Sequence, residues 1–223
     1  CLKQQQLGQA RQYTASLRQL YPEQSARLYL AESRALINQG QLDDSHKLLT
    51  EALLVYPREE SLLYARSTLS EERGDYSLME QDLQKILKHN PDNAIALNTL
   101  GYVLANRTDR LDEAYQLITR ALAAKPDDPA ILDSLGWVEY RRGNLAESLE
   151  LLTQAYTAYP DHEVAAHLGE VLWQLGQNEQ ALKIWKQGLK QTPDSPYILE
   201  TVQRLTPPQL QKQLPLPRQG NTD

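Results

Sequence analysis

The sequence contains a single cysteine, Cys1, so no disulfide can form within the chain. No apolar run approaches the roughly 18–20 residues that span a bilayer, which argues against insertion of this chain into a membrane. Basic residues do not dominate, because 23 lysines and arginines stand against 29 aspartates and glutamates, a formal net charge of −6. We therefore expect no nucleic-acid partner, since neutralising phosphates requires a basic surface.

Motifs for catalysis and metal binding are lacking as well. The closest pair of the four histidines, His162 and His167, has a spacing that does not place both rings on one helix face. The sequence has no phosphate-binding loop and no dinucleotide fingerprint. Ser134 lies within a predicted helix and not on the strained turn of a nucleophile elbow. We therefore predict that the chain is not an enzyme and has no cofactor and no metal site.

What the sequence does contain is a repeat. Residues 94–160 hold two copies of one pattern: Leu-Gly, an apolar stretch at helical spacing, a polar turn, a second apolar stretch and a proline. The same register extends further, because prolines recur every 33–35 residues at Pro57, Pro91, Pro126, Pro160 and Pro193. A fixed period of this length indicates a solenoid of helix pairs, in which each unit buries its apolar face against a neighbour. No strand-like alternation is present, so the predicted class is all-α.

This pattern resembles the tetratricopeptide repeat (TPR). In the register of that family, the small residue between the two helices of a unit falls at Ser33, Ser67, Gly101, Gly136 and Gly169. The turn glycine falls at Gly40, Gly74, Gly143 and Gly176, where a positive φ is expected. The resemblance implies a right-handed α-solenoid of antiparallel helix pairs, the TPR superhelix. It divides the chain into five repeats, at residues 26–59, 60–93, 94–128, 129–161 and 162–195.

The ends of the chain carry separate predictions. Residues 1–25 fit the second helix of a truncated upstream repeat and a turn, so we expect the array to continue toward the N-terminus, with any signal peptide upstream. Cys1 is either an ordinary cysteine at a fragment boundary or a lipidated mature N-terminus. Residues 196–205 are predicted to form a capping helix. The Pro-rich tail, residues 206–223, is expected to be disordered, either as a solvated terminus or as a peptide for another domain.

Three residues carry predictions about packing. Arg66 and Ser70 stand where the family usually has apolar residues, which predicts looser packing of the first helix in the second repeat. Trp185 occupies a packing position in the second helix of the last repeat. We therefore predict that Trp185 belongs to the core.

The resemblance also implies which positions of each first helix face the concave side of the array. In the first two repeats these are Arg27, Leu30, Arg34, Ile37, Asn38, Ser61, Tyr64, Thr68, Glu71 and Glu72, and the third set begins at Ile95. In the last three repeats they include a candidate partner-binding site: Asn98, Tyr102, Asn106, Asp133, Trp137, Tyr140, Arg141, Glu170 and Trp173. Aromatic rings bury a large area at small entropic cost, and polar groups fix the register of a bound peptide.

A structural role is the alternative for the same residues. Trp137 and Tyr140 would then wedge between adjacent first helices, and Asn98, Asn106 and Arg141 would lie on a solvated face. The candidate site also differs from the grooves of TPR proteins that capture acidic chaperone tails. Aromatic residues and an aspartate replace the lysines of those grooves, and the aspartate would repel a bound carboxylate.

The last three repeats also resemble the C-terminal arrays of TPR proteins from Gram-negative bacteria, several of which are outer-membrane lipoproteins. One of these lipoproteins is the adaptor of a periplasmic carboxyl-terminal processing protease. The resemblance implies a non-catalytic scaffold or adaptor that binds a protein or peptide through its concave groove. It also implies a periplasmic location with a lipid anchor upstream of this chain, and a periplasmic protease as the partner. The alternatives are a cytoplasmic location and a structural assembly protein that self-associates through helix edges or ends.

Overall fold

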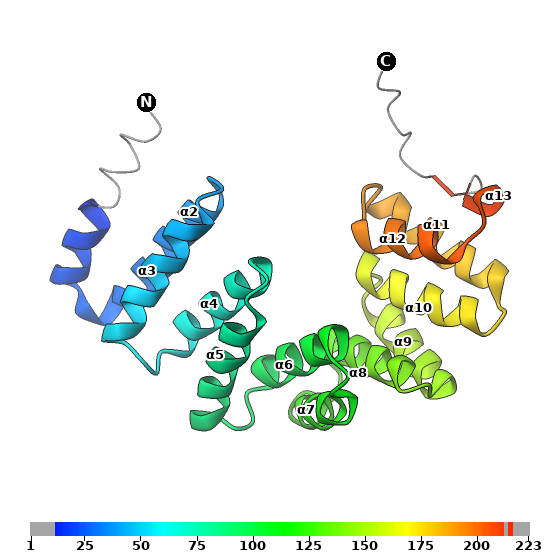
Figure 1. Cartoon of the computed structure of the whole chain (residues 1–223), viewed down its shortest axis with the longest axis horizontal. Helices are drawn as coiled ribbons and strands as arrows, with labels where there is room; N and C mark the ends of the chain where they lie inside the picture. The colour runs from blue at the N-terminus through cyan, green and yellow to red at the C-terminus, as the bar shows by residue number, and fades with distance from the viewer. Residues whose placement is uncertain (1–11, 212–213, 216–223) are drawn as a thin grey trace, which may run out of the picture. The chain divides into compact units, whose positions relative to one another are not determined.

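The computed structural model of the chain describes residues 12–211 and 214–215. Every regular element in these residues is a helix, so the predicted all-α class is confirmed (Figure 1). The chain divides into two compact units, Cys1–Ala96 and Leu97–Asp223. Within each unit, consecutive helices pack as antiparallel pairs, which confirms the predicted solenoid class (Figure 1). Among the described residues, no helix is both long and apolar enough to cross a membrane.

The first unit contains two complete helix pairs. They follow a helical stretch at residues 12–20 and the short 3₁₀-helix η1 (Pro22–Gln24). The pairs are α2 (Ser25–Ile37) with α3 (Leu42–Val55), and α4 (Glu60–Glu72) with α5 (Tyr76–His89). The leading helices of the two pairs, α2 and α4, also contact each other. Two leading helices of this unit therefore form one continuous wall.

The second unit continues the same arrangement. Its helices are α6 (Ala94–Arg107), which begins at the unit boundary, α7 (Leu111–Ala124), α8 (Pro129–Arg141), α9 (Leu145–Ala158), α10 (His162–Gln174) and α11 (Asn178–Gln191). Helix α8 contacts both α9 and α10, and α10 contacts α11. Each of these two leading helices therefore packs against its own partner and against the other.

Glycines separate the helices of most pairs and also allow the helices to approach closely. Gly40 and Gly74 adopt φ values of 73° and 75°, as the turn prediction requires of a residue without a Cβ. A Cβ added to Gly169 would lie 2.0 Å from Nε1 of Trp185, a distance that no side chain tolerates. Trp185 itself is fully buried and donates its indole N–H to the carbonyl of Ala166. Its predicted place in the core is confirmed.

The predicted looser packing around Arg66 is wrong. Only 7% of Arg66 is exposed, and its guanidinium donates two hydrogen bonds to the carboxylate of Asp82 on α5, at 2.7 and 2.8 Å. A third bond reaches the hydroxyl of Thr50 on α3. The charge is thus paired in the interior, where a family consensus residue would make apolar contacts. Ser70 is buried too, and its hydroxyl makes no hydrogen bond among the described residues.

The C-terminal end of the second unit is covered by α12 (Pro196–Leu205). The hydroxyl of Ser195 caps this helix by accepting a hydrogen bond from the backbone N–H of Ile198. Ile198 is fully buried in the apolar cluster that contains Trp185. The described part of the tail, residues 206–211 and 214–215, differs from the expected disorder, because α13 (Pro208–Gln211) adds a helical turn and Leu214 is buried in the same cluster. The alternatives for Cys1 and the prediction for residues 216–223 lie outside the described residues.

Candidate partner-binding surfaces

The first unit has a groove on its leading helices, α2 and α4. We call it the α2–α4 groove, and its volume is about 760 Å³. It is lined by Arg27, Leu30, Ala31, Ser33, Arg34, Ile37, Asn38, Ser61, Tyr64, Ala65, Thr68, Leu69 and Glu72. Most positions that the repeat register assigns to the concave side of the first two repeats thus lie on one groove. Its volume is in the range of sites that bind small ligands or side chains of a partner.

A smaller hollow of about 210 Å³ adjoins the α2–α4 groove. The two hollows share Ser61 and Tyr64, and the smaller one adds Ile95, whose exposed fraction is 52%. Tyr64 is 37% exposed, so its ring is accessible at the junction of the hollows. The first unit therefore presents two large apolar side chains to solvent along one surface.

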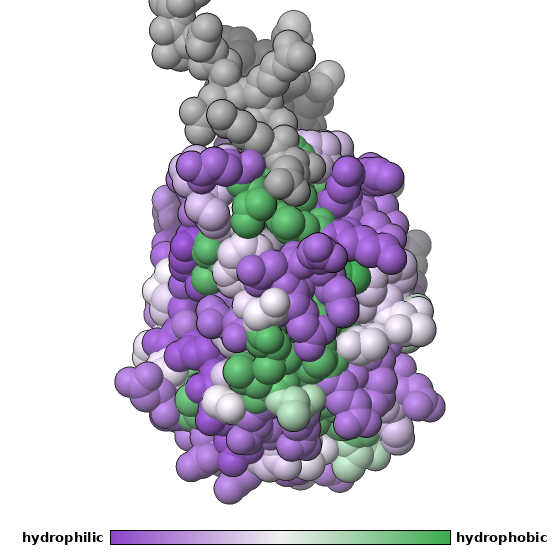
Figure 2. All heavy atoms as spheres, turned by 90° about the vertical axis from the view of Figure 1, so that its right-hand side faces the viewer, coloured by the Kyte–Doolittle hydropathy of each residue, from purple (hydrophilic) through white to green (hydrophobic). Residues whose placement is uncertain are grey.

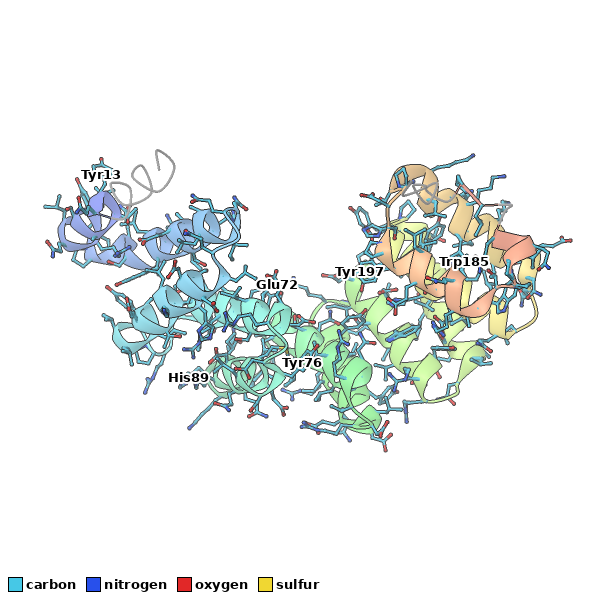
Figure 3. The ribbon with its side chains drawn as sticks, turned by 45° about the horizontal axis from the view of Figure 1, so that its top comes forward. Tyr13, Glu72, Tyr76, His89, Trp185 and Tyr197 are labelled. Carbon is cyan, nitrogen blue, oxygen red and sulfur yellow. The ribbon has the colours of Figure 1, made fainter. Side chains whose placement is uncertain are left out.

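Charged residues occupy the edges of the α2–α4 groove. Arg27 and Arg34 are exposed on α2, and neither makes an ion pair with another described residue. Glu72 is exposed at the end of α4 and is the one acidic residue of the described lining (Figure 3). This lining therefore carries two positive charges against one negative charge, opposite in sign to the chain as a whole.

The residues predicted as the binding site lie in the second unit, where side chains of adjacent leading helices join. Trp137 on α8 stacks on His167 of α10, with ring centroids 4.2 Å apart, and donates its indole N–H to Asn106 on α6 at 2.6 Å. Nδ1 of His167 lies 3.0 Å from Oδ1 of Asp133. Trp137 and Tyr140 are 5.0 Å apart, centroid to centroid. The leading helices α6, α8 and α10 are thus connected through Trp137, which stacks on His167 of α10 and donates a hydrogen bond to Asn106 of α6.

Three more hydrogen bonds extend this network. The hydroxyl of Tyr140 donates to Glu170 at 2.8 Å, and the other oxygen of Glu170 accepts a bond from Arg204 of α12 at 2.6 Å. The hydroxyl of Tyr102 on α6 donates to Glu163 of α10 at 2.6 Å. These polar atoms already have partners within the fold. A bound peptide would have to replace those bonds or contact the rings alone.

The environment of the network shifts the pKa values of His167, Tyr140 and Tyr102. Burial is the largest influence on His167 and by itself lowers its pKa, but the charge and hydrogen bond of Asp133, with Glu163 and Glu170, outweigh burial and raise the pKa. Burial, followed by the bond to Glu170, raises the pKa of Tyr140 to about 12. Burial and the nearby charge of Glu163 also raise the pKa of Tyr102. Both tyrosines therefore remain neutral donors near neutral pH.

The remaining predicted residues are placed differently. Arg141 donates to the backbone carbonyl of Ala105, so it joins α8 to α6 and does not extend into solvent. Trp173 turns toward the core, with its ring centroid 5.8 Å from that of Trp185. Asn98 is half-buried, and its side-chain oxygen makes no hydrogen bond among the described residues. Hydrogen bonds and ring contacts therefore join most of the other predicted residues to neighbouring leading helices, whereas among the described residues none joins Asn98 or Trp173 to them.

Sequence reasoning missed His167 and Arg204 as members of this network, and it placed Glu163 on the concave side without including it in the candidate site. A signal for the two missed residues exists, because His167 follows Asp133 by 34 residues and Arg204 follows Glu170 by 34 residues, about one repeat. Complementary side chains one repeat apart lie side by side on adjacent leading helices. Among the described residues, no group of three or more His, Cys, Asp or Glu is arranged to hold a metal ion.

The second unit also has a hollow lined by residues of the trailing helices α9 and α11 and of the leading helix α10. Its volume is about 400 Å³, and Leu149, Tyr156, Leu172 and Ile184 of α9, α10 and α11 are among its lining residues. Figure 2, which views the side that carries the C-terminal helices, shows apolar residues in separate patches among hydrophilic ones. The lining of the 400 Å³ hollow also includes polar side chains, those of Gln177, Gln180, Lys183 and Gln187. Lys183 is the one charged residue of this described lining, so the charge of the hollow does not indicate a class of partner.

Sequence comparisons match parts of the chain to known repeats. Two family models described as Tetratricopeptide repeat match residues 71–129 and 140–205. The chain is 48% identical over 169 residues to the TPR repeat-containing protein PA4667 of Pseudomonas aeruginosa, covering 76% of this chain and 29% of that protein. It is 26% identical over 172 residues to human Tetratricopeptide repeat protein 7A, covering 77% of this chain and 16% of that protein. The chain thus spans less than a third of the length of these two relatives.

Solved structures share the architecture. A TPR protein of Thermus thermophilus, TTC0263, has a TM-score of 0.67 at 19% identity, covering 81% of this chain and 96% of that chain. PilF of Pseudomonas aeruginosa has a TM-score of 0.65 at 19% identity, covering 86% and 96%. A chain of the Cut9–Hcn1 hetero-tetramer of the APC/C has a TM-score of 0.74 at 15% identity, covering 92% and 41%. At these identities the likeness shows the helix-pair fold alone.

Proposed function

We propose, from the premise that this chain belongs to the tetratricopeptide repeat family, that it is a non-catalytic scaffold that binds a protein partner on its leading helices. The TPR fold supports a role in protein interaction. The observation that carries the proposal is the α2–α4 groove, whose lining combines exposed charges with the accessible ring of Tyr64. Aromatic and arginine side chains of this kind are the residues that most often dominate binding energy at interfaces.

The second unit has a different part in this proposal. The polar groups of Trp137, Tyr140 and Glu170 are engaged within the fold, so their contribution to binding is through ring faces and through the rigidity of the wall. The groove of the first unit has no such internal network between Arg27 or Arg34 and other described residues. We therefore place the main contacts of the partner in the first unit and keep the predicted residues of the second unit as a secondary surface.

The finer proposal concerns the partner and its compartment. The resemblance of the last three repeats to arrays of Gram-negative envelope lipoproteins supports an adaptor for a periplasmic protease, with a lipid anchor outside this chain. This proposal makes the periplasm the place to look for the partner. Fractionation of cells that produce the whole protein tests it directly: recovery in the cytosolic fraction would contradict it.

Site-specific photo-crosslinking tests the scaffold proposal. A benzoyl-phenylalanine in place of Thr68, which is exposed in the α2–α4 groove, is expected to form adducts with a partner protein in cells. The matched control replaces Glu51, which is exposed on α3 away from the groove lining. We expect adducts at Thr68 and few at Glu51, with mass spectrometry to identify the captured protein. Equal adducts at the two positions, or none at Thr68, would count against the groove.

A further inference from the structure

We propose that the α2–α4 groove receives an amphipathic α-helix of the partner, with apolar residues at heptad spacing and carboxylates seven residues apart that pair with Arg27 and Arg34. This inference rests on the proposed function of the groove and specifies the chemistry of its partner. Two independent features of the lining carry it: the spacing of the lining residues along the two helices, and the sign of the charge at the groove.

The lining residues follow a heptad-like spacing. On α2 they include Arg27, Leu30, Arg34 and Ile37, which are three, four and three residues apart. On α4 they include Ser61, Tyr64 and Thr68, which are three and four residues apart. Alternating steps of three and four keep side chains on one stripe that faces a partner helix, as at positions a and d of a coiled coil. Two adjacent stripes of this kind form the groove into which a third helix packs.

The distance between the arginines fits the same occupant. A rise of 1.5 Å per residue places the backbones of Arg27 and Arg34 about 10.5 Å apart along α2. Carboxylates seven residues apart on a bound helix have the same separation and the same face, so both pair at once. On an extended strand, residues three apart span a similar length but point to opposite faces. A helix therefore matches both arginines, whereas a strand matches one.

Charge and apolar surface define the rest of the occupant. Arg27 and Arg34 are exposed, and no acidic partner for them exists among the described residues. The net positive lining in a chain of net charge −6 favours an acidic segment over a basic one. Leu30 and Ala31, between the two arginines on α2, line the groove together with Tyr64 and Leu69 of α4 and make part of its lining apolar. The occupant therefore carries apolar side chains inward and carboxylates at the edge, as in helix-in-groove recognition.

A peptide titration tests the inference. The probe is a synthetic fluorescein-labelled helical peptide with leucines at heptad positions a and d and two glutamates seven residues apart. We expect saturable binding to the full chain by fluorescence anisotropy, weakened by salt. The double variant Arg27→Glu with Arg34→Glu should bind it on the order of tenfold more weakly, since two attractions become repulsions. Arg58→Glu, an exposed reversal outside the groove lining, should leave the affinity unchanged.

A peptide of opposite charge distinguishes the loss of the two charge pairs from misfolding of the double variant. A peptide with lysines in place of the two glutamates should bind the double variant more tightly than it binds the wild-type chain. A third peptide, with a proline at a central solvent-facing position, should bind neither protein, because proline breaks the helix. Equal affinity of the glutamate peptide for wild-type and doubly reversed chains would overturn the inference. Undiminished binding of the proline peptide would overturn it as well.

Two further outcomes separate this inference from the proposed function. Light scattering that shows a dimer in the wild-type chain and a monomer in the double variant would make a second copy the occupant and overturn the inference. Crosslinking at Thr68 combined with no binding of the glutamate peptide would also overturn the inference but leave the scaffold function standing. Peptide binding without any cellular adduct at Thr68 would instead count against the scaffold function.

Discussion

The buried carboxylate of Asp82 shows how a single residue departs from the repeat pattern and remains compatible with the fold. It is fully buried and accepts hydrogen bonds from Arg66 and Lys85. Removal of this carboxylate leaves the guanidinium charge of Arg66 buried without its ion-pair partner. We expect Asp82→Ala to lower the free energy of unfolding by about 3–5 kcal/mol, measured by urea denaturation.

Two controls isolate the charge effect. The double variant Arg66→Met with Asp82→Leu should be close to wild type or more stable, because no unpaired charge is left in the interior. Glu113→Ala, which removes the partner of Arg110 in an exposed ion pair, should change stability by less than about 1 kcal/mol. An Asp82→Ala variant with wild-type stability would show that water reaches the pair.

His167 makes the stability of the second unit depend on pH. Its pKa is raised in the folded state, so the stabilisation is fully present below the unfolded value of about 6.5 and is lost as the pH rises through the folded pKa. The groups that face it are Asp133, Glu163 and Glu170, all acidic. We therefore expect the melting temperature to fall as the pH rises above about 6.5.

The matched variant is His167→Gln, which keeps a polar side chain but does not titrate. Its melting temperature should depend less on pH over the same window, whatever its absolute stability. Calorimetry at several pH values gives both slopes. Equal slopes in the two proteins would mean that the imidazole is not the titrating group.

At the scale of elements, α12 determines how the second unit ends. Ile198 is fully buried, and its Cδ1 lies 2.5 Å from the point where a Cβ on Gly188 would be. Glycine at position 188 therefore lets α12 lie directly on α11. We expect Ile198→Ala to lower the free energy of unfolding by about 2–5 kcal/mol, because it leaves a cavity at this contact.

The control for that variant is Gln203→Ala on the exposed side of the same helix. It should change stability by no more than about 0.5 kcal/mol. Thermal denaturation followed by circular dichroism measures both. A small effect of Ile198→Ala would show that α12 is not needed to cover the core of the unit.

Most of the helical elements were predictable because the repeat register encodes them locally. Turn glycines such as Gly40 and Gly74 mark where one helix ends, since a positive φ is easily adopted only without a Cβ. The core position of Trp185 followed from the same register. The helical turn at Pro208–Gln211 was not predicted, because its stretch has no apolar periodicity and Leu214 packs against a core formed by distant residues.

For the whole molecule, the sequence by itself determined the helix pairs, their order and the positions that line a leading-helix groove, because each depends on spacing within one repeat. The tertiary structure alone decided which of those positions remain open. Arg27, Tyr64 and Arg34 line a groove, whereas Trp137, Tyr140 and Glu170 are bonded to neighbouring helices. The physical reason is that a polar side chain on a leading helix bonds to the neighbouring helix where a complementary group faces it, and stays exposed where none does.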